Sequence, residues 1–391
     1  MNIADRLSCI RPSATLAVNA KAMELKAKGQ KIVSLAIGEP DFPTPAHVCK
    51  AAQKAIDEGF TRYTAVPGIP ELRRAVGTYY KRSYDLEPPV ESVLISNGGK
   101  QSLFNYFMAL LNPGDEVIIP APYWLSYPDM VMLAGGVPVF LPVSAKEAFK
   151  LTPERIVKAI TPKTRLFILN APSNPTGASY SPEEFDALVE CCVKKGVCVA
   201  SDEMYDRIVY APAKSVSAIH WWQRYPELVS VFNGCSKSFS MTGWRVGYCV
   251  GHPELIKAMD TIQGQTTSNV CSIAQKAAVA ALEGSYDCVA EMTAAFQRRR
   301  DLALNILSSW KGVICPKPDG AFYLFADMSC YFGRNGIANS ADLCTYFLEK
   351  AGVALVPGSA FGDDACVRFS YAVADEALEQ ALKSMEKVLP E

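Results

Sequence analysis

The sequence has few histidines, and its cysteines show none of the CxxC spacing that metal sites use. Its 391 residues include three histidines, His47, His220 and His252, and 13 cysteines scattered from Cys9 to Cys366. A structural zinc site needs clustered cysteine or histidine ligands, so we expect no metal site. Scattered thiols are typical of a reducing compartment, and we therefore expect a cytoplasmic protein.

An excess of charge of one sign and long apolar runs are also missing. The chain has 39 basic and 40 acidic residues, which leaves a net charge of -1. This balance gives no electrostatic reason to expect nucleic acid or an anionic membrane as a partner. No apolar run approaches the roughly 20 residues of a membrane span, and Asp5 and Arg6 interrupt the N-terminus where a signal peptide would be apolar.

Three familiar motifs are absent as well. The sequence contains no GxGxxG, no GxxxxGK[ST] and no GxSxG, so dinucleotide-binding, P-loop and serine-hydrolase interpretations have no motif support. What the chain does have is apolar material: 49% of its residues are hydrophobic, which suffices for a sizeable core and excludes a mainly disordered chain.

Short apolar runs alternate with helical patterns through the middle of the chain. The runs that predict strands are residues 93–96, 116–120, 137–142, 165–170, 197–203, 229–234 and 246–251. Such an alternation is typical of a mainly parallel sheet with helices on both faces. We therefore predict an α/β fold with a large domain at about residues 45–280.

The two ends of the chain differ from this middle part, and we assign residues 1–44 and 281–391 to a smaller α+β domain with an N-terminal arm. Before the alternation begins, the patterns predict helices at 13–29, 46–58 and 70–84. After it, they predict a long helix at 270–309, a hairpin at 312–328, a helix at 341–351, short strands around Val353–Val356 and Val367–Ser370, and a terminal helix.

Chemically informative residues follow the predicted strands. Asn174, Asp202, Tyr205 and Lys237 all lie at carboxyl ends of strands, where open α/β sheets bind ligands. Lys237 stands among small residues in NGCSKSFSMTGWRVG, with Arg245 eight residues on. A nearby cation lowers the pKa of a lysine toward a nucleophilic amine, although spacing alone also fits a surface lysine in a loop.

The same segment resembles the pyridoxal-phosphate attachment site of class I aminotransferases. The resemblance extends over nearly the whole chain and is closest to the aspartate/prephenate aminotransferase subgroup. The motifs that carry it, in the family's order, are PSATLAVNAKA, GEPDF, YTAVPGIPELR, NGGKQ, PAPYWLSYPDM, SNPTG, SDEMY, KSFSMTGWRVGY, DGAFY and VPGSAFG…VRFSYA. It implies the type I pyridoxal-phosphate transferase fold, with a mainly parallel seven-stranded sheet in the large domain and a smaller α+β domain.

The resemblance also implies roles for residues around the cofactor, pyridoxal 5′-phosphate. Lys237 would carry the cofactor and move the α-proton, and Asp202 would pair with its ring nitrogen. Tyr205 and Asn174 would hydrogen-bond its phenolic oxygen, and Trp124 would stack on its ring.

The cofactor phosphate would have its own group of ligands. Gly98, Gly99 and Lys100 would open a helix whose free N–H groups meet the phosphate. The further ligands that the resemblance implies are Ser236, Arg245 and, from the neighbouring subunit, Tyr63. A contribution from Tyr63 would make the protein a homodimer with composite active sites.

Other positions would bind the substrate. Arg368 would grip the α-carboxylate, and Gly38 would let the substrate pass close to the backbone; Trp124 and Asn174 would contact the substrate too. A second carboxylate would meet Arg11 and Lys100, with Thr15 nearby. Relatives commonly have lysine where this chain has Arg11, so the charge is retained with a different geometry.

The implied activity is a ping-pong transfer of an amino group between small amino acids and 2-oxo acids. We expect aspartate or glutamate as donor, and 2-oxoglutarate, oxaloacetate or prephenate as acceptor. Two alternatives stay open at this point. One is another reaction on the same fold, such as carbon–sulfur lysis or aminocyclopropane-carboxylate synthesis, and the other is a non-enzymatic, ligand-responsive module.

Overall fold

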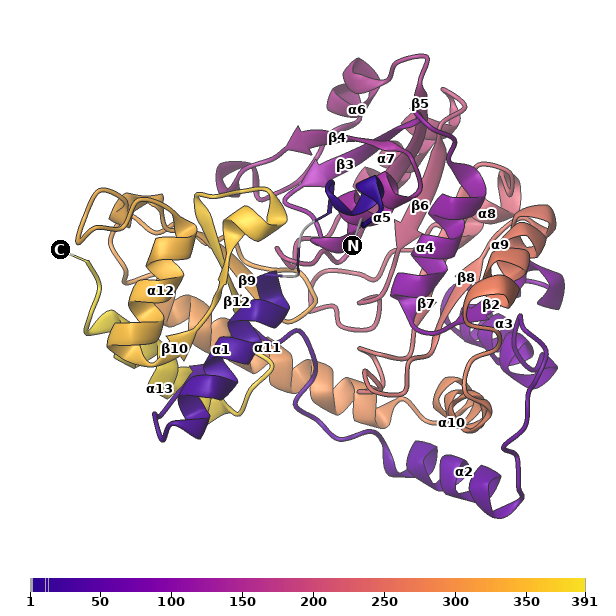
Figure 1. Ribbon diagram of the computed structural model, residues 1–391, viewed down its shortest axis with the longest axis horizontal. Coiled ribbons are helices and arrows are strands. Elements are labelled where there is room, and N and C mark those ends of the chain that lie inside the picture. The colour runs from indigo at the N-terminus through magenta and orange to yellow at the C-terminus, as the bar shows by residue number, and fades with distance from the viewer. Residues whose placement is uncertain (1–2, 11, 13, 391) are drawn as a thin grey trace.

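The computed structural model of the protein describes residues 3–10, 12 and 14–390, and its larger part is built around a seven-stranded sheet (Figure 1). The strands in spatial order are β2 (Val93–Ser96), β8 (Gly247–Val250), β7 (Val229–Gly234), β6 (Cys198–Asp202), β5 (Thr164–Asn170), β3 (Glu116–Ala121) and β4 (Val137–Pro142). β8 is antiparallel to both of its neighbours, and the remaining pairs are parallel. The mainly parallel sheet is therefore confirmed.

Helices cover both faces of this sheet. One face packs against α4 (Gly99–Leu110), α5 (Ser126–Leu133) and α9 (Pro253–Thr266). The other core includes α2 (Ala46–Asp57), α3 (Pro70–Tyr84), α6 (Pro153–Ala159), α7 (Pro182–Val193), α8 (Ile219–Arg224) and α10 (Ser272–Glu283). Within β5, Leu166 and Ile168 belong to the first core, and Phe167 and Leu169 to the second. Side chains alternate between faces along a strand, so burial on both sides explains the uninterrupted apolar runs of the sequence.

The C-terminal part of the chain forms a second layered unit, coloured orange and yellow in Figure 1. Its antiparallel sheet is β11 (Val356–Pro357), β12 (Cys366–Ser370) and β9 (Tyr323–Asp327). Around it lie α11 (Asp287–Leu307), α12 (Ser340–Ala351) and α13 (Asp375–Glu386). None of the helices in the described part of the chain is both long and apolar enough to cross a bilayer.

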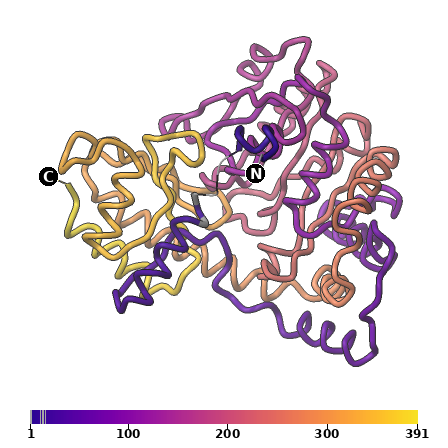
Figure 2. Tube along the Cα trace, viewed as in Figure 1, coloured from indigo at the N-terminus to yellow at the C-terminus, as the bar shows by residue number. Residues whose placement is uncertain are grey.

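The N-terminal segment joins this C-terminal unit. α1 (Ala14–Ala27) lies beside it in Figure 1, and β1 (Val33–Ser34) pairs in parallel with β10 (Val353–Ala354). The indigo trace in Figure 2 then crosses to the larger part. The second core also contains Tyr205 and Tyr210 from the larger part, so buried surface is shared between the two units, and the exact domain boundaries stay a prediction.

Two local predictions are wrong. The helix expected at 270–309 is two helices, α10 and α11, because the chain leaves α10 at Gly284 in an extended conformation. The hairpin expected at 312–328 has only one strand, β9; Ile314 makes a single bridge to Asp327, since the nearby prolines lack the N–H groups that a strand needs. The helices α8 and α9 were not predicted. Short 3-10 turns complete the described elements: η1 (Asp5–Leu7), η2 (Val90–Ser92), η3 (Ala145–Glu147), η4 (Ser329–Tyr331) and η5 (Gly358–Phe361).

Candidate active site

A cavity of about 310 Å³ lies at the carboxyl ends of the sheet strands, where they face β9 and β12. Its volume falls in the range of small-molecule sites, roughly 300–1,000 Å³. Most of the predicted site residues meet there. Those that line it are Thr15, Gly38, Gly99, Lys100, Trp124, Asn174, Asp202, Tyr205, Ser236, Lys237, Arg245 and Arg368.

Gly98 and Tyr63 are predicted residues that are not among the lining. Tyr63 is 89% exposed and lies outside the cavity. Arg11 falls outside the described residues, so its predicted contact stays a prediction. Thr15, four positions further on, does line the cavity, and its buried Oγ1 has no hydrogen-bond partner among the described residues.

Lys237 projects into the cavity from the segment that follows β7. Its Nζ donates a hydrogen bond of 2.6 Å to the carbonyl oxygen of Gly38. Burial lowers the pKa of Lys237 to about 8; Glu39 opposes this shift, whereas Arg245 and Arg368 add to it. The amine can therefore lose its proton near neutral pH, which a nucleophile or a general base requires.

Asp202 ends β6 directly beside this lysine-bearing segment and is 6% exposed. Its Oδ2 accepts a hydrogen bond of 2.5 Å from the hydroxyl of Tyr127, and its Oδ1 accepts one of 3.2 Å from the backbone N–H of Met204. Burial raises the pKa of Asp202 to about 6, and these two hydrogen bonds act in the opposite direction. Above that pH the group presents a buried negative charge to the cavity.

Tyr127 is a residue that the sequence analysis missed. It lies on α5, is 1% exposed, and its ring meets that of Trp124 edge to face. The signal was present in the segment PAPYWLSYPDM, where a second tyrosine follows the tryptophan by three positions. The backbone N–H of Tyr127 donates to the carbonyl oxygen of Trp124 at 3.0 Å, and both residues of this turn line the cavity.

The glycine-rich loop before α4 is packed against the backbone of β8. A Cβ at Gly247 would lie 2.2 Å from the backbone nitrogen of Gly99, and a Cβ at Gly98 would lie 2.3 Å from Nη2 of Arg245. Gly98 also has a φ of +84°, which side chains avoid. The packing leaves the N-terminus of α4 open beside an arginine, which is an arrangement suited to an anion such as a phosphate.

Two cations lie on the exposed side of this loop. Arg245 donates to the carbonyl oxygens of Thr242 at 2.9 Å and Asn97 at 3.3 Å. Lys100 lies 5.1 Å from the centre of the Trp124 ring. Burial lowers the pKa of Lys100, with Arg245 acting in the same direction and Asp129 against it. Lys100 is therefore a cation that an incoming anion would stabilise.

Arg368 enters the cavity from β12 and is 2% exposed. Its Nη1 donates to Oδ1 of Asn174 at 3.0 Å, and its Nη2 donates to the carbonyl oxygen of Ala36 at 2.7 Å. Burial lowers the pKa of Arg368, and its Nε has no partner among the described residues. A buried cation without a carboxylate is costly, so the position is prepared for an anionic ligand.

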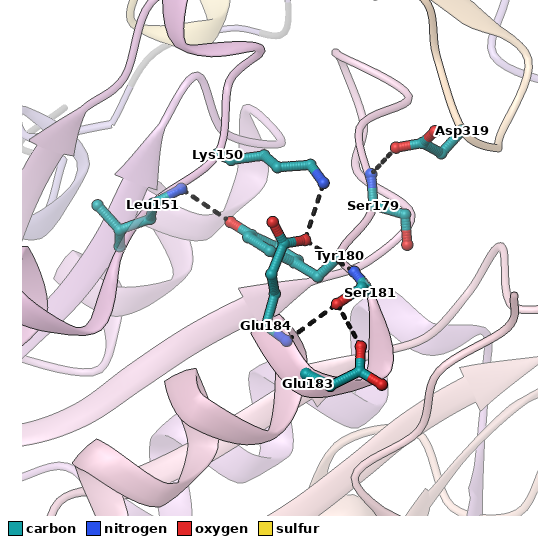
Figure 3. A network of polar contacts seen from close by, with 8 residues as sticks. All are labelled: Lys150, Leu151, Ser179, Tyr180, Ser181, Glu183, Glu184 and Asp319. Carbon is teal, nitrogen blue, oxygen red and sulfur yellow. Dashed lines mark hydrogen bonds and ion pairs between the residues drawn. The ribbon is translucent and has the colours of Figure 1, made fainter. Parts of the chain in front are cut away.

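Asn174 lies in the loop between β5 and α7, and later residues of this loop make polar contacts with neighbouring segments (Figure 3). Lys150 pairs with Glu184 at 2.8 Å, and the backbone N–H of Ser179 donates to Asp319 at 3.4 Å. Asp319 shortly precedes β9 in the C-terminal unit. The loop thus connects the two units through Ser179 and Asp319.

Tyr205 faces a second residue that the sequence analysis missed, Tyr323. Their hydroxyl oxygens are 2.9 Å apart, and Tyr323, at the start of β9, lines the cavity. Its guanidinium neighbour Arg368 lies 4.6 Å from the ring centre. A Cβ at Gly38 would come within 2.8 Å of the Tyr323 hydroxyl, so this hydroxyl gives a reason for glycine at position 38 besides the predicted substrate contact. The motif DGAFY includes Tyr323, but the sequence does not show that its side chain points toward Tyr205.

Within the described ranges, no group of three or more histidine, cysteine, aspartate or glutamate side chains is arranged to hold a metal ion. The charged groups of the cavity are instead one buried carboxylate and several cations. They surround a lysine whose amine is available near neutral pH. This combination defines a site for an anionic ligand that reacts with an amine.

Comparison with known proteins agrees with this arrangement. Residues 30–385 match the family model of aminotransferase class I and II. The chain is 47% identical over 391 residues to a probable aspartate/prephenate aminotransferase of Rhizobium leguminosarum bv. phaseoli, with 98% of each chain covered. It is 48% identical to the aspartate/prephenate aminotransferase of Cereibacter sphaeroides, covering 97% of this chain and 96% of that one.

Solved structures give the same result. The aspartate aminotransferase of Rhizobium meliloti matches with a TM-score of 0.95 at 42% identity, and that of Thermus thermophilus with maleate matches with a TM-score of 0.94 at 42% identity. Both comparisons cover 100% of each chain. The chain therefore belongs to the class I and II aminotransferases. It is an aminotransferase, and the enzymes of this family work with pyridoxal 5′-phosphate.

Proposed function

We propose that this enzyme moves an amino group between aspartate or glutamate and 2-oxo acids, with pyridoxal 5′-phosphate held in the cavity described above. The observation that carries the proposal is the meeting of Lys237, Asp202 and Arg368 in one cavity. An amine, a buried carboxylate and an unpaired buried guanidinium serve three different parts of this chemistry. They attach the cofactor, activate its ring and bind the substrate.

The residues present fit this cofactor. The open N-terminus of α4 at Gly99, together with Ser236 and Arg245, would hold its phosphate. Asp202, ionised above a pKa of about 6, would keep the ring nitrogen protonated. When bound, the cofactor supplies an electron sink for the negative charge that develops at the substrate Cα.

The remaining cofactor contacts are assigned in the same way. Trp124 would lie against the ring, and Tyr205 and Asn174 would donate hydrogen bonds to the phenolic oxygen. Each of these side chains lines the cavity. They orient the ring but carry no proton in the reaction, so we assign the proton transfer to Lys237.

Lys237 would take a proton from the substrate Cα and return it at the neighbouring carbon of the cofactor. A base of this kind works best when its pKa is near the working pH. Burial brings the pKa of Lys237 to about 8, which meets this condition. The hydrogen bond from its Nζ to Gly38 holds the amine at the substrate side of the cavity.

Arg368 would bind the α-carboxylate of every substrate. Because donor and acceptor both present this group, one site would serve both in turn, which is a ping-pong mechanism. Initial-rate measurements at several fixed acceptor concentrations test this directly. We expect parallel double-reciprocal lines, and intersecting lines would contradict the proposal.

The side-chain carboxylate of dicarboxylic substrates would meet Lys100 and Arg11, with Thr15 beside them. Arg11 lies outside the described residues, and the support on this side is the position of Lys100 and Thr15 at the cavity. A solved relative contains maleate, itself a dicarboxylate. Two relatives are named for prephenate as well as aspartate, and we propose prephenate as a third acceptor.

An assay of donors against acceptors, with prephenate included, tests substrate choice. We expect Lys100→Ala to lower the specificity for prephenate about a hundredfold, as the loss of one partner of a charge contact does. Arg11→Ala should shift the balance between acceptors, and Lys50→Ala, an exposed lysine on α2, is the control. Equal turnover of alanine and aspartate, unchanged by either substitution, would refute the dicarboxylate proposal.

We further propose a homodimer with composite sites, in the cytoplasm. Tyr63 is a large aromatic side chain that is 89% exposed, which suits a residue that completes the site of a second copy. Mixing Tyr63→Ala and Lys237→Ala subunits should restore activity, because each hybrid dimer regains one intact site. No regain after subunit exchange would contradict the composite site. The cytoplasmic assignment is supported by the thirteen cysteines, all of which are free thiols in the described chain.

A further inference from the structure

Tyr323 lines the cavity, and three observations describe its surroundings. Its hydroxyl oxygen is 2.9 Å from that of Tyr205, and it lies where a Cβ at Gly38 would be only 2.8 Å away. The face of its ring carries the guanidinium of Arg368 at 4.6 Å. Tyr323 has no measurable exposure, at 0%, so its hydroxyl orientation is set by these neighbours and not by solvent.

Each tyrosine hydroxyl has one proton and can donate only one hydrogen bond. In the proposed function, Tyr205 uses that proton to donate a hydrogen bond to the phenolic oxygen of the cofactor. The Tyr205 oxygen is then an acceptor toward Tyr323, and the donor in the tyrosine pair must be Tyr323. The other direction would aim the Tyr205 proton away from the cofactor.

We propose that Tyr323 is a positioning residue, whose hydroxyl donates to Tyr205 and thereby commits the single Tyr205 proton to the phenolic oxygen of the cofactor. This inference rests on the proposed function. Hydrogen bonds in such a chain polarise one another, so the donation from Tyr323 strengthens the bond that Tyr205 makes. Tyr323 acts through Tyr205 and needs no contact with the cofactor.

The proposal predicts a spectroscopic change in the cofactor-loaded enzyme. A donor on the phenolic oxygen stabilises its negative charge, so a weaker donor makes this oxygen more basic. The proton shared between this oxygen and the Lys237–cofactor link is then released at a higher pH. For Tyr323→Phe we expect the pH midpoint of the cofactor absorption to rise by about half a unit or more. The charged groups around the link stay in place: Asp202, Glu39, Arg245 and Arg368.

A double-mutant cycle separates this relay from a general disturbance of the site. Tyr205→Phe should raise the midpoint further than Tyr323→Phe does. Adding Tyr323→Phe to Tyr205→Phe should cause no additional shift, because the donor has lost its acceptor. Equal and additive shifts, or a Tyr323→Phe enzyme that titrates like the wild type, would overturn the proposal.

The control is Tyr371→Phe, which removes a hydroxyl from another buried tyrosine pair. Tyr371 donates to Tyr210 at 3.1 Å and does not line the cavity. The pH midpoint of the cofactor absorption in Tyr371→Phe should therefore match that of the wild type. If Tyr323→Phe fails to fold, Gly38→Ala displaces the same hydroxyl, and its shift should vanish in the Tyr205→Phe background. If the wild-type enzyme shows no cofactor absorption that depends on Lys237, the proposed function is refuted. If Tyr323→Phe has normal absorption and its pH midpoint equals that of the wild type, only the proposed role of Tyr323 is refuted.

Discussion

The two halves of the cavity are built in different ways. On the cofactor side, the candidate ligands sit on strand ends and on a glycine loop that is packed backbone to backbone, with Gly247 against Gly99. On the substrate side, a single buried arginine, Arg368, faces a segment around Thr15 that comes from the far end of the chain. The first half depends on close packing, and the second depends on charged side chains, with Arg368 the most buried of them, and on how the two units meet.

This difference shows which kind of substitution should disturb each half of the cavity. A side chain at Gly247 has to displace the glycine loop, because its Cβ would lie 2.2 Å from the backbone nitrogen of Gly99. For a substitution at Arg368 we expect an intact fold and a loss of substrate binding. The experiments below test that contrast, beginning with the largest expected effect.

In the proposed function, Lys237 belongs to the cofactor side but acts on the substrate. Lys237→Ala removes both the attachment point and the proton carrier, and turnover should fall by several orders of magnitude. The variant should still bind the cofactor, because the phosphate and ring contacts remain. Steady-state turnover and cofactor absorbance measure the two effects separately. Turnover near that of the wild type would show that the lysine has neither role.

Arg368→Met tests the substrate side. Both half-reactions should lose roughly 1.5–3 kcal/mol of binding to the α-carboxylate, or about ten- to a hundredfold in kcat/KM. The cofactor-free protein should keep or gain stability, because the substitution removes a buried charge that has no carboxylate partner in the described chain.

Single-turnover kinetics and a urea denaturation curve check the two expectations for Arg368→Met. Arg368→Lys is the matched control, since it keeps the charge but loses the fork geometry. A loss in only one half-reaction would contradict the shared binding site. A large loss of stability would mean that the arginine is structural.

Gly247→Ala tests the close packing on the cofactor side. The new Cβ would lie 2.2 Å from the backbone of Gly99, and such overpacking costs about 1–3 kcal/mol of the free energy of unfolding. Cofactor affinity should fall as well, because the loop before α4 must shift. Gly243→Ala, in the neighbouring turn, is the control, since its Cβ would meet nothing within 4 Å. Equal stabilities of the two variants would remove the packing argument.

The smallest effect concerns Asp202 and Tyr127. The pKa of Asp202 is raised to about 6 in the folded protein, so the folded state holds this proton more tightly than the unfolded chain does. For this group, the stability of the cofactor-free protein should therefore decrease as the pH rises from about 4 to 6. Cofactor affinity should follow the opposite trend and weaken below about pH 6, because the ring nitrogen needs the ionised carboxylate.

Tyr127→Phe sharpens this pH test. The hydroxyl of Tyr127 lowers the pKa of Asp202, so its loss should move the midpoint of cofactor affinity to higher pH. Binding titrations between pH 5 and 8, about the range around that value, measure the midpoint. Asp202→Asn should remove the pH dependence from this source. A midpoint that stays in place in Tyr127→Phe would show that the short hydrogen bond does not control the carboxyl.

Much of the cofactor side could be predicted from the sequence. Its residues follow strands whose apolar runs are uninterrupted, and parallel strands bring their carboxyl ends to one edge, so Asp202 and Lys237 were expected at the same edge of the sheet. The points at which helices end were harder to predict. One helical pattern at 270–309 is two helices, because the conformation of Gly284 interrupts it, and periodicity alone carries no such signal.

By itself, the sequence determined the alternation of strands and helices, the family, and the residue types at the strand ends. These properties depend on local patterning and on fixed spacing along the chain. Only the tertiary structure decided that Tyr127 contacts Asp202, that Tyr323 contacts Tyr205, and that Arg368 is buried without a carboxylate among the described residues. The two tyrosine contacts join residues that are 75 and 118 positions apart. The Tyr127–Asp202 contact follows from the packing of α5 against the sheet, and the Tyr323–Tyr205 contact follows from the packing of one unit against the other. No local pattern encodes either arrangement.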